Sequence, residues 1–443
     1  MLRRVLGGGL RPEVWLLVLV GAYVLLGSLY ALRTPLWQNP DEPAHYNYLR
    51  QLSTGGGVPV LQAGDYQQAA IERLMEARFP PSMAVDSLRY EGHQPPLYYV
   101  LGAAVDWTLS GADLAIRGRA LRLFGVLLGA GIVLAAYRAG RLLFPSQPPL
   151  ALGVAAVPAL LPQHVAMTAA INNDALGWLL CALVLWAALH MVQRPLSLTS
   201  LRSQVLLGGL MGAVLLTKTT AFACLALPAM AALAPRLAGV RPESRAVRGF
   251  VVAYTIALAI GCAWFLRNVS VYGGVDFLGL TRHNDIVTGQ PLAQGWDLGN
   301  VRSLVTTLFQ SAWVQLGWMA VPAQPWVYAL LAAVTGVLAG GAALAIRRGA
   351  WAGSVGRMHL ALLVTPACLA LLQVAYYNLQ FLQPQGRYLF TALIPAGALV
   401  MAGVPLWTGA RWAPWLVLVL CLGLAGLNVH ALTVLIPFLE PLQ

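Results

Sequence analysis

Long apolar runs recur along the whole chain, and they constrain its fold more than any other feature. A run of about 20 apolar residues is long enough to cross the hydrocarbon core of a bilayer as an α-helix. The 443 residues are 58% hydrophobic and only 10% charged, whereas soluble domains are about 25% charged. This composition excludes a soluble globular fold, and its hydrophobicity excludes a disordered chain. The sequence therefore predicts an all-α polytopic membrane protein that forms a single transmembrane domain over residues 1–443.

Eleven segments are expected to cross the membrane. They lie at residues 13–32, 119–137, 149–168, 174–192, 204–217, 219–235, 249–267, 325–346, 358–377, 387–405 and 413–433. The apolar stretch 95–110 is shorter and reads either as a twelfth span or as a re-entrant or interfacial helix. The first span resembles a signal peptide, but it is too long for one and no small-residue cleavage site follows, so we interpret it as retained.

The distribution of charge orients these spans. If residues 95–110 do not cross, 15 of the 28 basic residues fall on short loops of one side, and 14 of the 16 acidic residues fall on the other. Basic short loops face the cytoplasm. The predicted cytoplasmic residues are Arg3, Arg4, Arg11, Arg138, Arg141, Arg194, Arg202, Arg236, Arg241, Arg245, Arg248, Arg347, Arg348, Arg357 and Arg411, with Glu13 and Glu243 as the acids among them. We therefore expect eleven crossings, with 95–110 outside that count.

Two long loops lie on the predicted outer side, at residues 33–118 and 268–324. Long loops inside a compact protein usually carry function. A catalytic or recognition face that looks outward follows from this placement.

The first long loop opens with Asn39-Pro40-Asp41-Glu42-Pro43. Asp41 suits a helix N-cap, and Pro43 suits the first helical turn. The apolar and aromatic positions that follow are spaced as on one face of an amphipathic helix. Asp41 would then be either a structural cap or a carboxylate held rigidly at the membrane surface.

The same loop ends with Glu91-Gly92-His93-Gln94-Pro95-Pro96-Leu97-Tyr98-Tyr99. The two prolines begin the segment 95–110, and the tyrosines suit the headgroup zone of a bilayer. His93 and Gln94 are expected at the mouth of that helix, with an exposed loop histidine as the alternative reading.

Further polar residues fall at the outer ends of later spans. Asn173 and Asp174 begin the span 174–192, and Lys218, the single lysine of the chain, lies between two short spans. A lone lysine at membrane depth is costly and indicates either function or a snorkelling anchor. Arg267, Arg282, His283 and Arg387 end the series on the same predicted face. Each arginine taken alone would also fit a span-end anchor.

These segments together resemble the GT-C class of membrane glycosyltransferases, which take sugars from polyprenyl-phosphate carriers. Asn39–Tyr46 is similar to the first outer-loop motif of that class, and His93–Tyr99 is similar to its HxPP or KPP-Tyr segment. Segments at 172–175, 217–218, 266–273 and 386–389 are similar to recurring family segments in the expected order, so the resemblance covers about residues 13 to 405. The class includes protein O-mannosyltransferase-like and lipid A aminoarabinose transferase-like proteins.

The resemblance implies an inverting transfer of a sugar from a polyprenyl-phosphate carrier to a lipid, glycan or protein hydroxyl on the outer face of the membrane. It places the general base at Asp41, with Glu42 as its support or as an acceptor ligand. The expected ligands of the donor phosphate are Arg387, Arg267 and Lys218. The expected substrate-binding residues are His93, Gln94, Tyr98, Asn173, Asp174, Arg282 and His283. Some relatives carry lysine where Gln94 stands, so a charge role there passes to another residue or is absent.

Other chemistries have weaker support in the sequence. The five cysteines lie in apolar runs without zinc or disulfide spacing. No cofactor is expected beyond a divalent cation, for which Asp41 and His93 would form at most a weak site, and no nucleic-acid partner is expected. A secondary transporter and a non-catalytic envelope assembly protein stay open as alternatives. Against a transporter, the ionisable residues gather at one face, and no internal repeat is evident.

Overall fold

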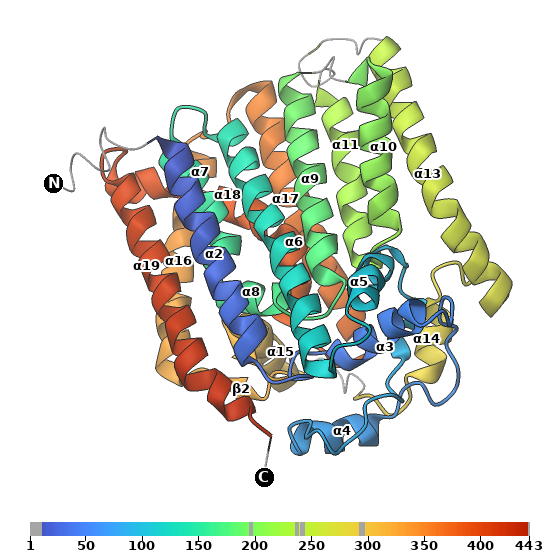
Figure 1. The fold of residues 1–443 in the computed structure, drawn as a ribbon. Helices are drawn as coiled ribbons and strands as arrows, with labels where there is room; N and C mark the ends of the chain where they lie inside the picture. Colours follow the sequence, from blue (N-terminus) through green and yellow to red (C-terminus); the bar gives the residue numbers. More distant parts are fainter. Residues whose placement is uncertain (1–10, 195–197, 235–238, 240–243, 292–296, 442–443) are drawn as a thin grey trace.

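The computed structural model describes residues 11–194, 198–234, 239, 244–291 and 297–441, and this part of the chain is almost entirely helical (Figure 1). The first helices are α2 (Pro12–Arg33), α3 (Glu42–Ser53), α4 (Gln68–Glu76), the 3₁₀ helix η1 (Tyr90–His93), α5 (Leu97–Thr108) and α6 (Leu114–Leu143). The middle of the chain forms α7 (Pro148–Leu160), α8 (Pro162–Thr168), α9 (Asp174–Gln193), α10 (Leu201–Leu215), the 3₁₀ helix η3 (Thr219–Leu225), α11 (Ala226–Ala232) and α13 (Ser244–Tyr272).

The last part of the chain adds four long helices and a small hairpin. Its elements are α14 (Leu280–Ile286), α15 (Leu298–Trp313), β1 (Gln315–Leu316), β2 (Val321–Pro322), α16 (Pro325–Arg347), α17 (Gly353–Asn378), the 3₁₀ helix η4 (Gly386–Ala392), α18 (Leu393–Thr408), α19 (Ala413–His430), the π-helix η5 (Ala431–Leu435) and the 3₁₀ helix η6 (Ile436–Leu439). The two strands pair antiparallel, with Gln315 opposite Pro322. The fold class predicted from the sequence, an all-α membrane protein with short helices in its first long loop, is confirmed.

All eleven predicted spans are helical, but they differ in length. Among the described residues, eight helices are long and apolar enough to cross a membrane, and α7 with α8 forms a ninth span that is bent by 60°. The bend falls at Pro162, which has no N–H to continue the ladder of α7. The remaining two, α10 and the pair η3 and α11, are shorter than a regular span.

The segment 95–110 forms α5, which has 12 residues. At 1.5 Å per residue it is too short for a hydrocarbon core of about 30 Å. It packs against α3, at the end of the bundle where α4 and α14 also lie (Figure 1). We call this end, defined by α3, α4, α5 and α14, the loop end. The position of α5 agrees with an interfacial helix rather than a twelfth span.

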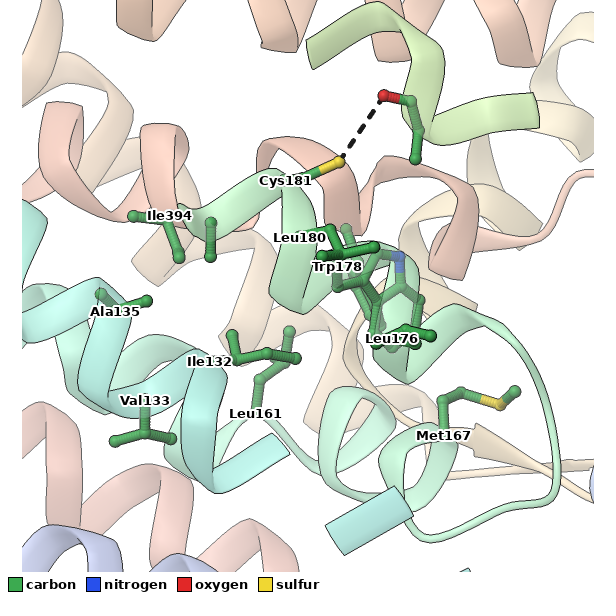
Figure 2. Packing of buried hydrophobic residues seen from close by; sticks show 14 of the residues in the cluster. Ile132, Val133, Ala135, Leu161, Met167, Leu176, Trp178, Leu180, Cys181 and Ile394 are labelled. Atoms are coloured by element: carbon green, nitrogen blue, oxygen red, sulfur yellow. Dashed lines mark hydrogen bonds between the residues drawn. The ribbon is translucent and has the colours of Figure 1, made fainter. Parts of the chain in front are cut away.

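The bundle core holds the N-terminal end of α9 in place. Figure 2 shows Trp178 and Leu176 of α9 in a buried cluster with Ile132 of α6 and Met167 of α8. One turn further along α9, the Cys181 thiol lies 3.8 Å from the backbone oxygen of Ala221 in η3, the contact dashed in Figure 2. Close packing of this kind leaves little freedom to the first residue of α9, which is Asp174.

The opposite end of the bundle carries the basic residues that predict a cytoplasmic location. Arg3, Arg4, Arg236, Arg241 and Glu243, which contributed to that prediction, lie outside the described residues.

We expect Ser244→Cys, in a cysteine-free background, to resist a membrane-impermeant maleimide in intact cells. Ser244 begins α13 at the end opposite the loop end, and its neighbours Arg245 and Arg248 are basic. The matched control is Ala69→Cys on α4, an exposed loop-end position that we expect to react. Labelling of Ser244→Cys from outside would overturn the orientation.

Candidate functional site

Asp41 lies at the entrance of α3 in a strained conformation. Its backbone has a φ of 64°, in the left-handed region that residues other than glycine seldom adopt. Its side chain makes no cap hydrogen bond to α3, so the structural-cap interpretation is wrong. The carboxylate instead accepts hydrogen bonds from the Tyr90 hydroxyl, at 2.9 Å, and from the Arg387 guanidinium. Strain of this kind is typical of functional sites.

Arg387 connects this carboxylate to a second one. The Arg387 side chain is 4% exposed, and its Nη1 lies 3.6 Å from Oδ2 of Asp174. Asp174 in turn accepts a 2.7 Å hydrogen bond from Lys218 Nζ. Four charges from four parts of the chain therefore alternate in sign, in the order Asp41, Arg387, Asp174, Lys218. We call these four residues the charge chain.

The charge chain assembles because short elements end at the same depth. Asp174 opens α9, Arg387 lies in η4, and Lys218 lies in the turn between α10 and η3. Since α10 has only 15 residues, it spans about 22 Å, which is less than the roughly 30 Å of a hydrocarbon core. Lys218, which follows α10, is therefore expected within the depth of the membrane. A buried lysine at this depth needs an anionic partner, which Asp174 supplies.

Two amides join the charge chain to the first long loop. Asn173 Oδ1 accepts a hydrogen bond from Lys218 Nζ at 3.0 Å, and its Nδ2 donates to Gln94 Oε1 at 3.3 Å. The sequence-based site therefore comes together for six of its residues, which are Asp41, Arg387, Asp174, Lys218, Asn173 and Gln94.

The titration behaviour of the loop-end groups follows from burial and from these charges. Burial has the largest single effect on the Asp41 carboxyl and would raise its pKa. The charges of Arg387 and His45 and the hydrogen bonds from Arg387 and Tyr90 together outweigh burial, so the pKa lies below its ordinary value. Burial lowers the pKa of His45, whose Nδ1 lies 2.8 Å from the Tyr99 hydroxyl. The Asp41 carboxyl is therefore ionised at neutral pH, as a general base requires.

Sequence reasoning assigned no role to three polar residues beside Asp41. Tyr90 holds its carboxylate, His45 stands one helical turn along α3, and Glu91 is buried with one carboxyl oxygen free of hydrogen-bond partners. Burial raises the pKa of Glu91. The segment that the sequence analysis singles out begins at Glu91, and Tyr90 directly precedes it. Spacing alone does not indicate which side chains turn toward Asp41.

Glu42 does not face a substrate. Its carboxylate is completely buried and accepts two hydrogen bonds from Arg122, at 2.7 and 2.6 Å, and two more from the backbone N–H groups of Trp37 and Ile171. Each carboxylate oxygen of Glu42 thus accepts two hydrogen bonds from within the protein. The expectation that Glu42 binds the acceptor is wrong, and its remaining role is to anchor the turn that presents Asp41.

Arg267 and Arg282 lie in a second group, apart from the charge chain. Arg267 donates to the backbone oxygen of Pro59, and its guanidinium lies 5.0 Å from the ring centre of Trp264. Arg282 donates to the oxygen of Leu61 at 3.2 Å. Both arginines therefore fasten loop 59–61 to α13 and α14, and no contact of Arg267 among the described residues reaches Arg387.

His93 and His283 meet across the two long loops. Their ring centres are 4.3 Å apart, and burial lowers the pKa of both imidazoles. Over the described ranges, no group of three or more His, Cys, Asp or Glu side chains is arranged to hold a metal ion. The weak metal site expected at Asp41 and His93 thus gains no third ligand there.

Tyr98 lies in the core rather than in the site. It is fully buried, and its ring packs edge-on against Tyr99 and at a tilt against Phe124 of α6. The substrate contact predicted at Tyr98 stays a prediction. Tyr99 points toward the site, with its hydroxyl next to His45.

Comparison of the sequence with protein-family models and with curated proteins finds no match. Solved structures share the fold. ArnT from Cupriavidus metallidurans bound to undecaprenyl phosphate superposes with a TM-score of 0.52 at 14% identity, over 96% of this chain and 74% of that one. The archaeal oligosaccharyltransferase AglB from Archaeoglobus fulgidus, in complex with an inhibitory peptide and a dolichol-phosphate, gives a TM-score of 0.54 at 14% identity, over 96% of this chain and 55% of that one.

This chain thus spans about half the length of AglB. One of these structures holds undecaprenyl phosphate and the other a dolichol-phosphate. At 14% identity the likeness concerns architecture, and it agrees with the resemblance of the sequence motifs. The chain therefore has the fold of ArnT and of the oligosaccharyltransferase AglB, which is the architecture that the GT-C resemblance of its sequence motifs implies.

Proposed function

We propose that this protein transfers a sugar from a polyprenyl-phosphate carrier to an acceptor hydroxyl at the outer face of the membrane, with inversion at the anomeric carbon. The observation that carries the proposal is the direct contact between Asp41 and Arg387 at the loop end. It joins an ionised carboxylate suited to a general base with a buried cation suited to a phosphate.

Arg387 has the properties of an anion ligand. Its guanidinium is almost completely buried, and its Nε carries an N–H without a hydrogen-bond partner. Leaving a buried donor unpaired costs about 1–3 kcal/mol. A phosphate oxygen would satisfy this donor, and Lys218 supplies a second cation nearby, on the other side of Asp174. The developing charge on a leaving phosphate is the kind of charge that such preorganised donors stabilise.

Asp41 is accessible to an acceptor. Its side chain is 21% exposed, whereas Asp174 is 3% exposed and Glu42 is fully enclosed. A retaining mechanism would need a second carboxylate as nucleophile, with the two carboxyls about 5 Å apart. Since the Glu42 carboxylate is buried against Arg122, it is not available as a second carboxylate beside Asp41. The Asp41 and Glu42 pair therefore supports inversion.

The fold explains how a membrane-bound carrier meets a polar acceptor. A polyprenyl tail stays in the bilayer while its phosphate and sugar lie at the interface, the depth at which α9, η3 and η4 bring the charge chain together. Structures with this fold include one bound to undecaprenyl phosphate and one in complex with dolichol-phosphate. A transporter would place its ionisable groups near the midplane of the bundle, whereas here they gather at the loop end.

The proposal is tested with purified protein and an undecaprenyl-phosphate-linked sugar. We expect release of undecaprenyl phosphate when acceptor lipids are supplied, and no release when the charge chain is disrupted. Uptake of the intact carrier into vesicles without cleavage would favour the transporter.

Arg387→Ala is expected to weaken binding of the donor by about 1.5–3 kcal/mol, the range for a hydrogen bond to a charged group. Lys218→Ala should have a smaller effect in the same direction, because its ammonium already pairs with Asp174. Arg267→Ala is the matched control, since it removes a cation that fastens loop 59–61. Donor titrations of the three variants decide the point. Wild-type affinity in both Arg387→Ala and Lys218→Ala would place the phosphate elsewhere.

A further inference from the structure

We propose that Arg387 exchanges one anion for another during the reaction: it holds Asp41 in the free protein and holds the carrier phosphate once the carrier binds. The inference rests on the proposed function and adds to it a competition between the base and the phosphate for one cation. The competition predicts that a change at Asp41 alters the affinity for the carrier phosphate. The expected roles of Asp41 as base and of Arg387 as phosphate ligand do not predict this effect separately.

The competition follows from the geometry of Arg387. Its Nη2 is bonded to Asp41, its Nη1 faces Asp174, and only Nε is unpartnered. A phosphate bound to Nε and Nη2 in the usual forked manner would share Nη2 with Asp41. A phosphate beside an ionised Asp41 would also be repelled, since two like charges at about 4 Å interact by about 4 kcal/mol near a protein surface. Asp41 and the phosphate therefore compete for Arg387.

Of the two carboxylates on Arg387, Asp41 is the one able to leave. Asp174 is the first residue of α9, its Oδ1 accepts from Lys218 at 2.7 Å, and its backbone N–H donates to Asn172 at 3.0 Å. Asp41 lies in a turn, in a strained left-handed conformation, with its side chain partly exposed. Asp174 is thus a positioning residue that keeps Arg387 in place when Asp41 releases it.

The chemical step moves charge in the same direction as this exchange. The acceptor oxygen forms a bond to the anomeric carbon, and the bond from that carbon to the phosphate oxygen breaks with its electron pair on the phosphate. The acceptor proton passes to Asp41. A carboxylate is neutralised while the phosphodiester monoanion becomes a monoester dianion, so the total charge of the site is unchanged. Arg387 loses its attraction to Asp41 as its attraction to the phosphate grows.

A neutral residue at position 41 should therefore bind the product carrier more tightly than the wild-type protein does. The probe is undecaprenyl phosphate in detergent, titrated at pH 7.5, with undecaprenol as the lipid that lacks the phosphate. We expect Asp41→Asn to lower the Kd for undecaprenyl phosphate about tenfold, the size of one charge-assisted contact, and to leave undecaprenol unchanged.

Two further variants isolate the shared cation. Asp86→Asn makes the same change in net charge on the first long loop, at an exposed pair with Arg50, and should leave the Kd as it is. In Asp41→Asn/Arg387→Ala the gain should vanish, so that the double variant binds like Arg387→Ala alone. Circular dichroism and size-exclusion profiles confirm that each variant is folded.

The outcomes separate this inference from the function on which it rests. If wild-type protein binds undecaprenyl phosphate no better than undecaprenol, the proposed phosphate site fails. If it binds the phosphate but Asp41→Asn binds equally or more weakly, the proposed function survives and the exchange at Arg387 is overturned. The exchange is also overturned if the tighter binding persists in the double variant.

Discussion

Asp41→Asn is expected to yield a folded protein that binds the carrier and transfers sugar at least 100-fold more slowly. The amide keeps the shape of the side chain and still accepts a hydrogen bond from Tyr90, but it takes no proton from an acceptor. General-base catalysis contributes about 10²–10⁴-fold, so its loss lowers turnover while carrier binding is retained or tightened. The measurement is single-turnover transfer at saturating donor, in parallel with carrier binding.

A loss of stability does not explain such a result. Asp41 makes no cap hydrogen bond to α3, so removing its charge costs no cap. Asp86→Asn is the matched control, because Asp86 lies on the same loop in an exposed pair with Arg50. Near-normal turnover in Asp41→Asn would eliminate Asp41 as the base. The next candidate would then be Glu91, which lies beside Asp41, and not Glu42, which is sealed against Arg122.

Glu42→Ala is expected to cost about 3–5 kcal/mol of stability, the usual consequence of removing one partner from a buried ion pair. The substitution leaves Arg122 and the backbone N–H groups of Trp37 and Ile171 without their acceptor. Arg122 keeps its contacts to the backbone oxygens at 31, 34 and 35. The link from Arg122 to the start of α3, which Glu42 provides, is lost. Denaturant or thermal unfolding in detergent measures the loss.

The control for Glu42→Ala is the exposed pair. Asp86→Ala breaks a bridge between side chains that are 47% and 62% exposed, and such pairs contribute about 0–1 kcal/mol. Replacing both partners, as in Glu42→Leu/Arg122→Met, should recover much of the loss, because no unpaired charge then stays buried. Equal stability of Glu42→Ala and the wild-type protein would show that the pair does not anchor the turn.

The sequence determined the membrane architecture and the loop that carries the proposed base. A bilayer permits few backbone arrangements, so runs of apolar residues predict helices directly. All eleven expected spans are helical in the structure, and a helix begins directly after Asp41, as Pro43 in its first turn indicates. The shortness of α10 and of the pair η3 and α11 also follows from apolar runs that are interrupted at Lys218.

Only the tertiary structure decided which charges meet. Asp41 and Arg387 are separated by 346 positions, and Glu42 and Arg122 by 80. The adjacent carboxylates of Asp41 and Glu42 thus lie in different surroundings. The left-handed backbone at Asp41 turns its side chain toward η1 and η4, while the first turn of α3 buries Glu42 against α6. Neighbours in sequence fix the backbone of a helix start, but the partner of a charged side chain is set by how distant helices pack, and sequence spacing does not encode that directly.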